Sequence, residues 1–163
     1  MSGKSKRWGN GSESSRIQRK TFVKVFFDTS VLIPAFLEDH EHHERSLNVF
    51  LKADKNQGGC AAHSLAEFYA IVTRLPGLHR LSSDQALLLV EEIYQRLAII
   101  ALNAEEYFWA VRSAAPLGIV GGTIYDVLLA RCALKAKAET IYTWNVRHFE
   151  RFGRELAERV RTP

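Results

Sequence analysis

Apolar residues along this chain fall into two alternating kinds of segment. Short runs rich in β-branched and aromatic residues are typical of buried strands, whereas longer stretches with helical spacing indicate amphipathic helices. Strands are predicted at residues 22–27, 98–102 and 140–144, with a very short one inside "GGCAAHS". Helices are predicted at about 31–37, 41–53, 64–75, 84–97, 104–115 and 124–138, and short basic helical segments complete the chain. Strands that alternate with helices imply crossovers, so we expect an α/β fold with a mostly parallel sheet between two helical layers.

Two of the predicted helices begin with a capping signature. Ser64 lies three residues before Glu67, and Thr123 lies three residues before Asp126. A hydroxyl followed three residues later by an acid is typical of a capping box, and acids favour helix N-termini in any case. Taken alone, either pair is better explained as a cap than as part of a functional site.

Asp28 changes this interpretation when the three acids are considered together. It ends the apolar run Val25–Phe27, where a buried carboxylate without a partner is costly. In a parallel sheet, the ends of strands and the starts of the following helices meet at the edge where ligands bind. Three carboxylates gathered there would repel each other, and a hard cation such as Mg²⁺ relieves that repulsion. We therefore expect a metal, rather than a side chain, to compensate Asp28.

Composition and the distribution of charge indicate one folded domain that follows a basic segment. The chain has 163 residues, of which 47% are hydrophobic and 25% charged, as expected for a single globular domain. Residues 1–20 carry a net charge of +5, residues 21–130 one of −5 and residues 131–163 one of +4. Residues 1–21 are predicted to be a disordered basic leader, and residues 22–163 the folded domain. The chain has no apolar run long enough to span a membrane, and its two distant cysteines favour a reduced, cytoplasmic protein.

Four segments, in this order, carry a resemblance to a known family. They are "VFFDTSVLI", "SLAEFYAIVTR", "IYDVLLARCAL" and "IYTWNVRHF". Together they resemble the PIN-domain ribonucleases, especially the single-domain VapC-like toxins of toxin–antitoxin pairs. The resemblance covers about residues 23–152, and its strength lies in the order and spacing of the four segments.

The resemblance implies a PIN-like three-layer fold with a central parallel sheet of four to five strands. It also implies an endoribonuclease that leaves 5′-phosphate and 3′-hydroxyl ends, a cognate antitoxin and a homodimer. The acidic pocket would bind one or two Mg²⁺ or Mn²⁺ ions. The residues that match the family's catalytic and metal-binding positions are Asp28, Glu67 and Asp126, with Thr29, Ser30 and Thr143 as supporting hydroxyls.

Asn145 departs from the family pattern, because many members have a fourth acid at this position. An amide can orient a water molecule but carries no charge, so a second metal ion is less favoured here. In the mechanism that the resemblance implies, Asp28 and Asp126 bind the metal directly. Glu67 is a further ligand or holds a water molecule on the metal.

Basic residues after the last predicted strand are candidates for binding RNA. Arg147, His148 and Arg151 should lie beside the carboxylates, where phosphate groups need neutralising, although a solvated surface explains them equally well. The His-rich segment "DHEHHER" (39–45) is better explained as an exposed helix start than as a metal site.

Two alternative functions stay open from the sequence. A catalytically decayed RNA-binding module would fit Asn145. A phosphoaspartyl hydrolase would use Asp28 as its nucleophile, but it requires a second Asp where Ser30 stands.

Overall fold

A single parallel sheet organises residues 22–163, which are the residues that the computed structural model describes; the predicted leader lies outside them. The strands are β1 (Val25–Phe27), β2 (Gly58–Ala61), β3 (Ala98–Ile100), β4 (Thr140–Tyr142) and β5 (Val160–Arg161). They lie in the order β3-β2-β1-β4-β5, and every neighbouring pair is parallel. The predicted α/β fold with a central parallel sheet is confirmed.

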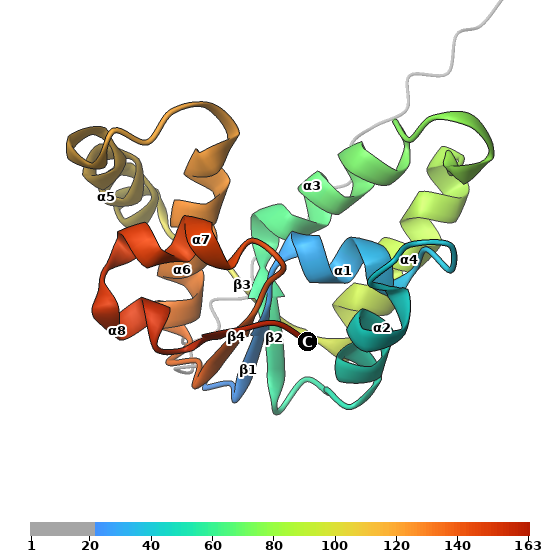
Figure 1. Ribbon diagram of the computed structural model, residues 1–163, viewed down its shortest axis with the longest axis horizontal. Coiled ribbons are helices and arrows are strands. Elements are labelled where there is room, and N and C mark those ends of the chain that lie inside the picture. The colour runs from blue at the N-terminus through green and yellow to red at the C-terminus, as the bar shows by residue number, and fades with distance from the viewer. Residues whose placement is uncertain (1–21) are drawn as a thin grey trace, which may run out of the picture.

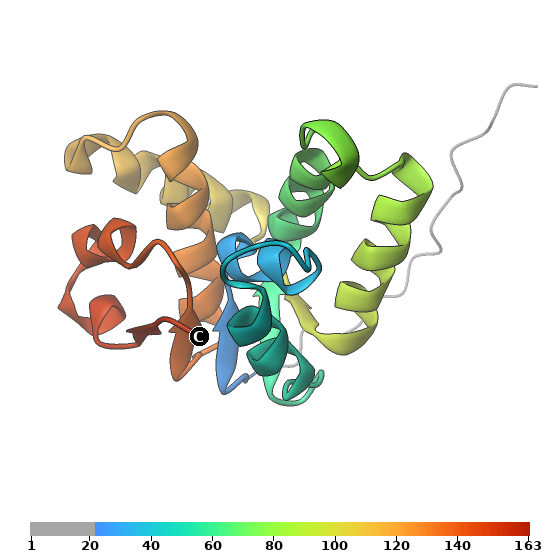
Figure 2. The same cartoon turned by 45° about the vertical axis from the view of Figure 1, so that its right-hand side comes forward.

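Helices cover both faces of this sheet (Figure 1). The main helices are α1 (Thr29–Ala35), α2 (His43–Leu51), α3 (Ala62–Val72), α4 (Ser83–Arg96), α5 (Ala104–Ala114), α6 (Ile124–Lys135), α7 (Val146–Phe149) and α8 (Arg154–Ala157). Short 3₁₀ turns occur at Gly77–His79, Ala115–Leu117, Gly121–Thr123 and Glu150–Phe152. Figures 1 and 2 show α1 to α4 on one side of the sheet and α5 to α8 on the other.

The side chains of β1 point alternately to the two faces of the sheet and contribute to the core on both sides. Phe26 packs into a cluster with residues of α6, α7 and α8, whereas Phe27 packs on the opposite face with residues of α1 to α4. Successive side chains of a strand point to opposite faces, so one short strand contributes to both layers. Phe26 and Phe27 are both completely buried, which explains the unbroken apolar run in the sequence.

Three local predictions need correction. The helical spacing of residues 41–53 places Leu47, Phe50 and Leu51 on one face, but Leu51 is 55% exposed, and the buried residues of α2 are Ser46 and Phe50. The end of the chain was expected to be helical, yet Val160–Arg161 forms β5 beside β4. The two glycines of "GGCAAHS" are typical of a chain break before the short strand, but Gly58 lies inside β2. Glycine fits there because a Cβ would lie 2.7 Å from the Cβ of Ala53.

The strand order places a topological switch point between β1 and β4. From β1 the chain builds outward through β2 and β3 and then returns to place β4 on the other side of β1. Ligands bind at such switch points, beyond the carboxyl ends of the strands. Asp28 directly follows β1 and Thr143 directly follows β4, so both lie at this position. Among residues 22–163, no helix combines the length and the apolar character needed to cross a bilayer.

Candidate active site

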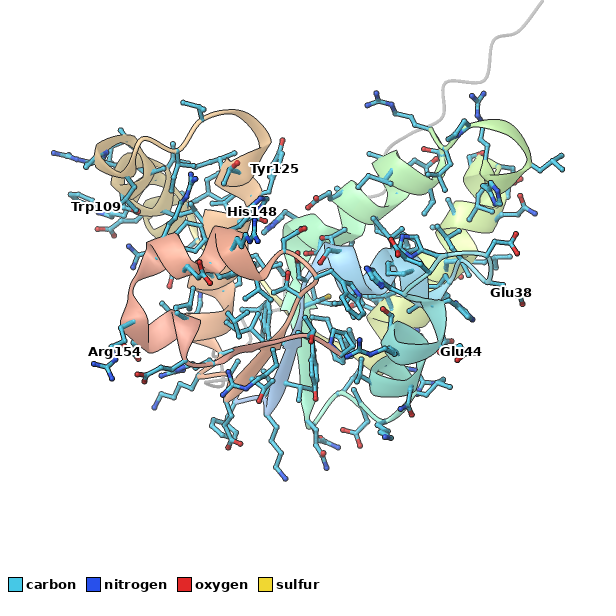
Figure 3. All side chains as sticks on the ribbon, in the orientation of Figure 1. Glu38, Glu44, Trp109, Tyr125, His148 and Arg154 are labelled. Atoms are coloured by element: carbon cyan, nitrogen blue, oxygen red, sulfur yellow. The ribbon has the colours of Figure 1, made fainter. Side chains whose placement is uncertain are left out.

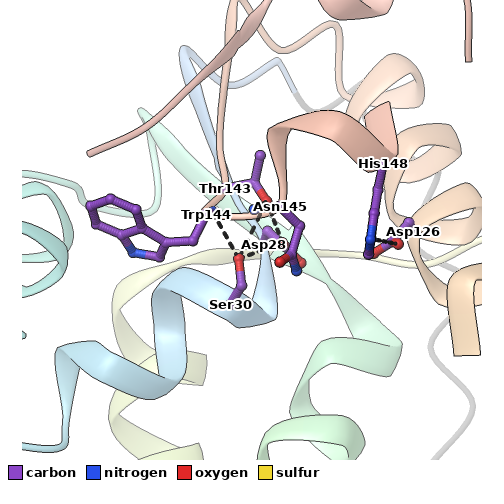
Figure 4. Close-up of polar contacts among 7 residues, drawn as sticks. All are labelled: Asp28, Ser30, Asp126, Thr143, Trp144, Asn145 and His148. Atoms are coloured by element: carbon purple, nitrogen blue, oxygen red, sulfur yellow. Dashed lines mark hydrogen bonds and ion pairs between the residues drawn. The ribbon is translucent and has the colours of Figure 1, made fainter. Parts of the chain in front are cut away.

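Asp28 is the most buried acid of the site, with 4% of its surface exposed. Its backbone N–H donates to the carbonyl of Tyr142, which ties the end of β1 to the end of β4. Its side chain does not cap α1; instead, its Oδ2 accepts hydrogen bonds from Ser30 Oγ and Thr143 Oγ1, both at 2.6 Å. Figure 4 shows these side chains gathered at one point with Asn145.

Each of the two hydroxyls is oriented by a backbone amide. The N–H of Trp144 donates to Ser30 Oγ at 3.0 Å, and the N–H of Asn145 donates to Thr143 Oγ1 at 2.9 Å. A hydroxyl has one proton to donate, so a hydroxyl that accepts from an amide can direct that proton to Asp28. The expectation that no side chain compensates Asp28 is therefore wrong for Oδ2, whereas the expectation of a metal stays a prediction.

Glu67 approaches the site from the first half of α3. Its Oε2 accepts a hydrogen bond from Thr29 Oγ1 at 3.2 Å. Thr29 is the first residue of α1 and directly follows Asp28, so this contact joins the start of α1 to the middle of α3.

Asp126 lies in the first turn of α6 and is paired with a residue of α7. Its Oδ2 lies 2.8 Å from Nδ1 of His148. Figure 4 shows His148 reaching from α7 to this acid, and Figure 3 shows where His148 lies in the whole molecule. The prediction that His148 lies beside the carboxylates is thus correct in position, although its partner in the structure is Asp126.

Neither predicted capping box forms. The helix α3 begins at Ala62, because β2 leads directly into it, so Ser64 lies inside the helix and its hydroxyl has no hydrogen-bond partner in residues 22–163. Thr123 precedes α6, but its backbone is already helical, with φ −62° and ψ −14°, and its side chain makes no capping bond. A capping side chain requires a non-helical backbone at that position. The capping explanation for Glu67 and Asp126 therefore fails.

The three carboxylates influence one another electrostatically. Burial raises the pKa of Glu67, and the negative charges of Asp28 and Asp126 raise it further, against the hydrogen bond from Thr29. Burial and the charge of Asp28 also raise the pKa of Asp126, whereas His148 lowers it. Nearby like charges disfavour the ionised form of a carboxyl, so the acids share one electrostatic environment.

A common pattern links the three acids. In each, one oxygen is held by a protein donor, while the other accepts no hydrogen bond from residues 22–163. Ligating carboxylates are usually supported in this way by a second layer of hydrogen bonds. Oxygen donors of this kind fit a hard divalent cation. Within the described residues, no three His, Cys, Asp or Glu side chains stand close enough together to form a complete metal-binding group.

The remaining predicted residues lie around this centre. Asn145 is exposed, directly precedes α7, and accepts a hydrogen bond from the N–H of His148 through its backbone carbonyl. Arg147 and Arg151 are also exposed, and neither forms an ion pair with another residue of the described range.

Sequence analysis missed His63, which lies on α3 one turn before Glu67. Its ring stacks against Tyr125 with a centroid distance of 6.1 Å, and its buried Nε2 has no partner in residues 22–163. Burial lowers the pKa of His63, against a hydrogen bond to the backbone of Tyr125 and the charge of Asp28. The spacing of four residues to Glu67, which puts both on one helix face, is the signal that could have indicated it.

Comparisons with known proteins agree with this architecture. Residues 25–155 match the family described as PIN domain. The chain is 34% identical over 112 residues to Ribonuclease VapC27 of Mycobacterium tuberculosis, which covers 69% of this chain and 78% of that protein. Its fold is similar to that of the Mycobacterium tuberculosis Sarcin-Ricin loop cleaving toxin VapC20, with a TM-score of 0.63, 12% identity and coverage of 76% and 92%. It is also similar to a toxin–antitoxin complex from Klebsiella pneumoniae, with a TM-score of 0.54, 13% identity and coverage of 77% and 89%.

Proposed function

The chain belongs to the PIN domain family, and we propose that it is a metal-dependent endoribonuclease, the toxin of a toxin–antitoxin pair. Two kinds of likeness support this function. A relative that is 34% identical over 112 residues is named a ribonuclease, and the fold resembles that of a Sarcin-Ricin loop cleaving toxin.

The arrangement of the three carboxylates carries the proposal. Asp28, Glu67 and Asp126 each have one oxygen held by a protein donor and the other without a hydrogen bond from residues 22–163. Acids that served only as helix caps would direct an oxygen to backbone N–H groups, and these do not. Repulsion among the three carboxylates is costly when nothing compensates it. A function that requires their negative charge therefore explains the arrangement better than helix capping does.

The ion would be Mg²⁺ or Mn²⁺, with Asp28 and Asp126 as direct ligands and Glu67 as a further ligand or a holder of water. When bound, a divalent ion lowers the pKa of a water molecule and stabilises charge on the phosphate that is cleaved. Thr29, Ser30 and Thr143 hold the carboxylates in orientation. Asn145 would orient a water molecule without adding charge.

His148 takes a different role from the one that the sequence indicated. Its contact with Asp126 supports a role in orienting that carboxylate, as second-layer partners do for metal ligands. Arg147 and Arg151 remain candidates for contacts with RNA phosphates, because both are exposed close in sequence to His148.

An antitoxin and RNA are the partners that follow from this function. The fold's similarity to a toxin–antitoxin complex supports an antitoxin. A basic side chain from the antitoxin could enter the acidic site, while its acidic groups meet the flanking arginines. We further propose a homodimer, to be tested by light scattering, and a cytoplasmic location, where RNA substrates occur.

The test is cleavage of RNA by purified protein with and without Mn²⁺. Asp28→Asn should abolish cleavage while the folded state persists, because the amide oxygen can still accept from Ser30 and Thr143. Asp84→Asn is the matched control, since Asp84 is an exposed acid in the first turn of α4, and it should keep full activity.

Cleavage that survives EDTA would refute metal dependence. RNA binding by the wild-type protein without any cleavage would instead favour the catalytically decayed RNA-binding module, which the uncharged Asn145 keeps as the second candidate.

A further inference from the structure

The His-rich segment 39–45, which sequence analysis treated as an exposed helix start, contacts the site through Trp144. The ring of His42 stacks on the ring of Trp144, with centroids 3.7 Å apart and an interplanar angle of 11°. The guanidinium of Arg45 lies 5.0 Å from the centre of the same ring. Arg45 also donates to the carbonyl of Pro163, so the start of α2 holds both Trp144 and the end of the chain.

The polar edge of Trp144 is fixed as well. Its Nε1 donates to Ser46 Oγ at 3.0 Å, and Ser46 is completely buried. A buried Trp N–H normally finds such a partner, and the hydrogen bond defines the direction of the ring in a way that apolar packing does not. The indole thus has a stacked face and an anchored edge.

The backbone of Trp144 belongs to the network around Asp28. Its N–H donates to Ser30 Oγ, and the same hydroxyl donates to Asp28 Oδ2 at 2.6 Å. Trp144 also separates Thr143, the second hydroxyl donor to Asp28, from Asn145. Figure 4 shows the indole extending away from Asp28 while its backbone lies beside Ser30.

We infer that Trp144 is a positioning residue for the acidic site: the start of α2 anchors its indole, and its backbone N–H thereby orients Ser30 and Asp28. This inference rests on the proposed ribonuclease function. It explains why a His- and Arg-containing turn about a hundred residues before Trp144 packs against the segment between two site residues. A small displacement of a catalytic group can cost a large factor in rate, so an anchor of this kind has a measurable effect.

The first experiment compares Trp144→Ala with Trp109→Ala. Trp109 is the matched control, because it is 51% exposed and also lies beside an arginine, with Arg112 at 4.9 Å, but its contacts do not lead to the acids. We expect Trp144→Ala to lower kcat by about ten- to a hundredfold with KM little changed, since orientation rather than RNA binding is lost. Mn²⁺ affinity, measured by calorimetry without RNA, should fall in the same variant. Trp109→Ala should leave kcat and Mn²⁺ affinity unchanged.

A double-mutant cycle separates positioning from a general structural role. If Trp144 acts through Ser30, then Trp144→Ala should lower kcat far less in a Ser30→Ala background than in the wild type. Equal losses in both backgrounds, or no loss in the wild type, would overturn the inference.

A milder pair of substitutions covers the case in which Trp144→Ala does not fold. Trp144→Phe keeps a stacked ring but removes the Nε1 donor. Ser46→Ala removes the acceptor of the same hydrogen bond. The two should lower kcat and Mn²⁺ affinity equally and non-additively; unequal or additive losses would contradict the inference. If the wild type cleaves no RNA, the proposed function fails, and the same cycles measured by Mn²⁺ affinity alone still decide the role of Trp144.

Discussion

Replacing Thr143 with valine removes one hydroxyl from the centre of the site and leaves its volume nearly unchanged. Thr143 is completely buried, and its hydroxyl donates to a charged acceptor, Asp28 Oδ2, at 2.6 Å. A hydrogen bond to a charged group contributes about 1.5–3 kcal/mol. The backbone N–H of Asn145 also loses its acceptor, in a contact that is partly buried. We therefore expect the free energy of unfolding to fall by about 2 kcal/mol.

Urea denaturation of the metal-free protein measures this effect. With an m-value of roughly 2 kcal/mol/M, the midpoint should fall by about 1 M. Thr143→Ser keeps the donor and should lie close to the wild type, apart from the loss of one methyl group. Thr140→Val is the matched control, because Thr140 begins β4 and its hydroxyl makes no hydrogen bond within residues 22–163. If Thr143→Val unfolds at the same urea concentration as Thr140→Val, the hydroxyl does not stabilise the buried charge and the reasoning is wrong.

Three further predictions concern the charges of the site. In metal-free protein the free energy of unfolding should fall as the pH rises above the ordinary carboxyl range. The pKa values of Glu67 and Asp126 are raised, so in that range the folded state keeps protons that the unfolded state has released. Glu67→Gln should weaken this fall, and a profile that rises with pH would contradict the repulsion. His148→Ala should move the acidic limb of the cleavage profile to higher pH, since His148 lowers the pKa of Asp126; an unmoved limb would show that their contact does not persist in solution. Asn145→Asp should add a second, weaker Mn²⁺ site in calorimetric titration; two similar sites in the wild type would remove Asn145 from the argument.

Much of the fold follows from local patterns. The run Val25–Phe27 and the strand over Thr140–Tyr142 could be predicted because both are short runs of β-branched and aromatic residues. The start of α3 could not, because it depends on how directly β2 leads into the helix, and no residue in "GGCAAHS" marks that junction. The two-residue strand β5 is defined only by its pairing with β4, and its own sequence, Val160–Arg161, carries no strand pattern.

In the candidate site, too, local features could be predicted from sequence, whereas long-range contacts could not. Asp28 and Asp126 could be found from sequence because one stands where a strand ends and the other where a helix begins, and the parallel sheet brings such positions to one edge. Glu67 was found through a predicted helix start that lies two residues too late, since α3 begins at Ala62 and Glu67 lies in its middle. Their hydroxyl partners Thr29, Ser30 and Thr143 could be named only from the family resemblance, and the individual contacts could not be predicted. Thr143 reaches Asp28 across 115 residues of chain, and the anchor between Trp144 and Ser46 spans 98. These contacts exist only because β4 pairs with β1 and the start of α2 packs against Trp144, and no local sequence pattern indicates either contact. The buried charge of Asp28 is thus encoded beside its own strand, whereas the hydroxyls and amides that tolerate it come partly from the far end of the sequence. A substitution at either end should therefore disturb the same carboxylate, and for that reason paired substitutions, rather than single ones, are the decisive experiments on this site.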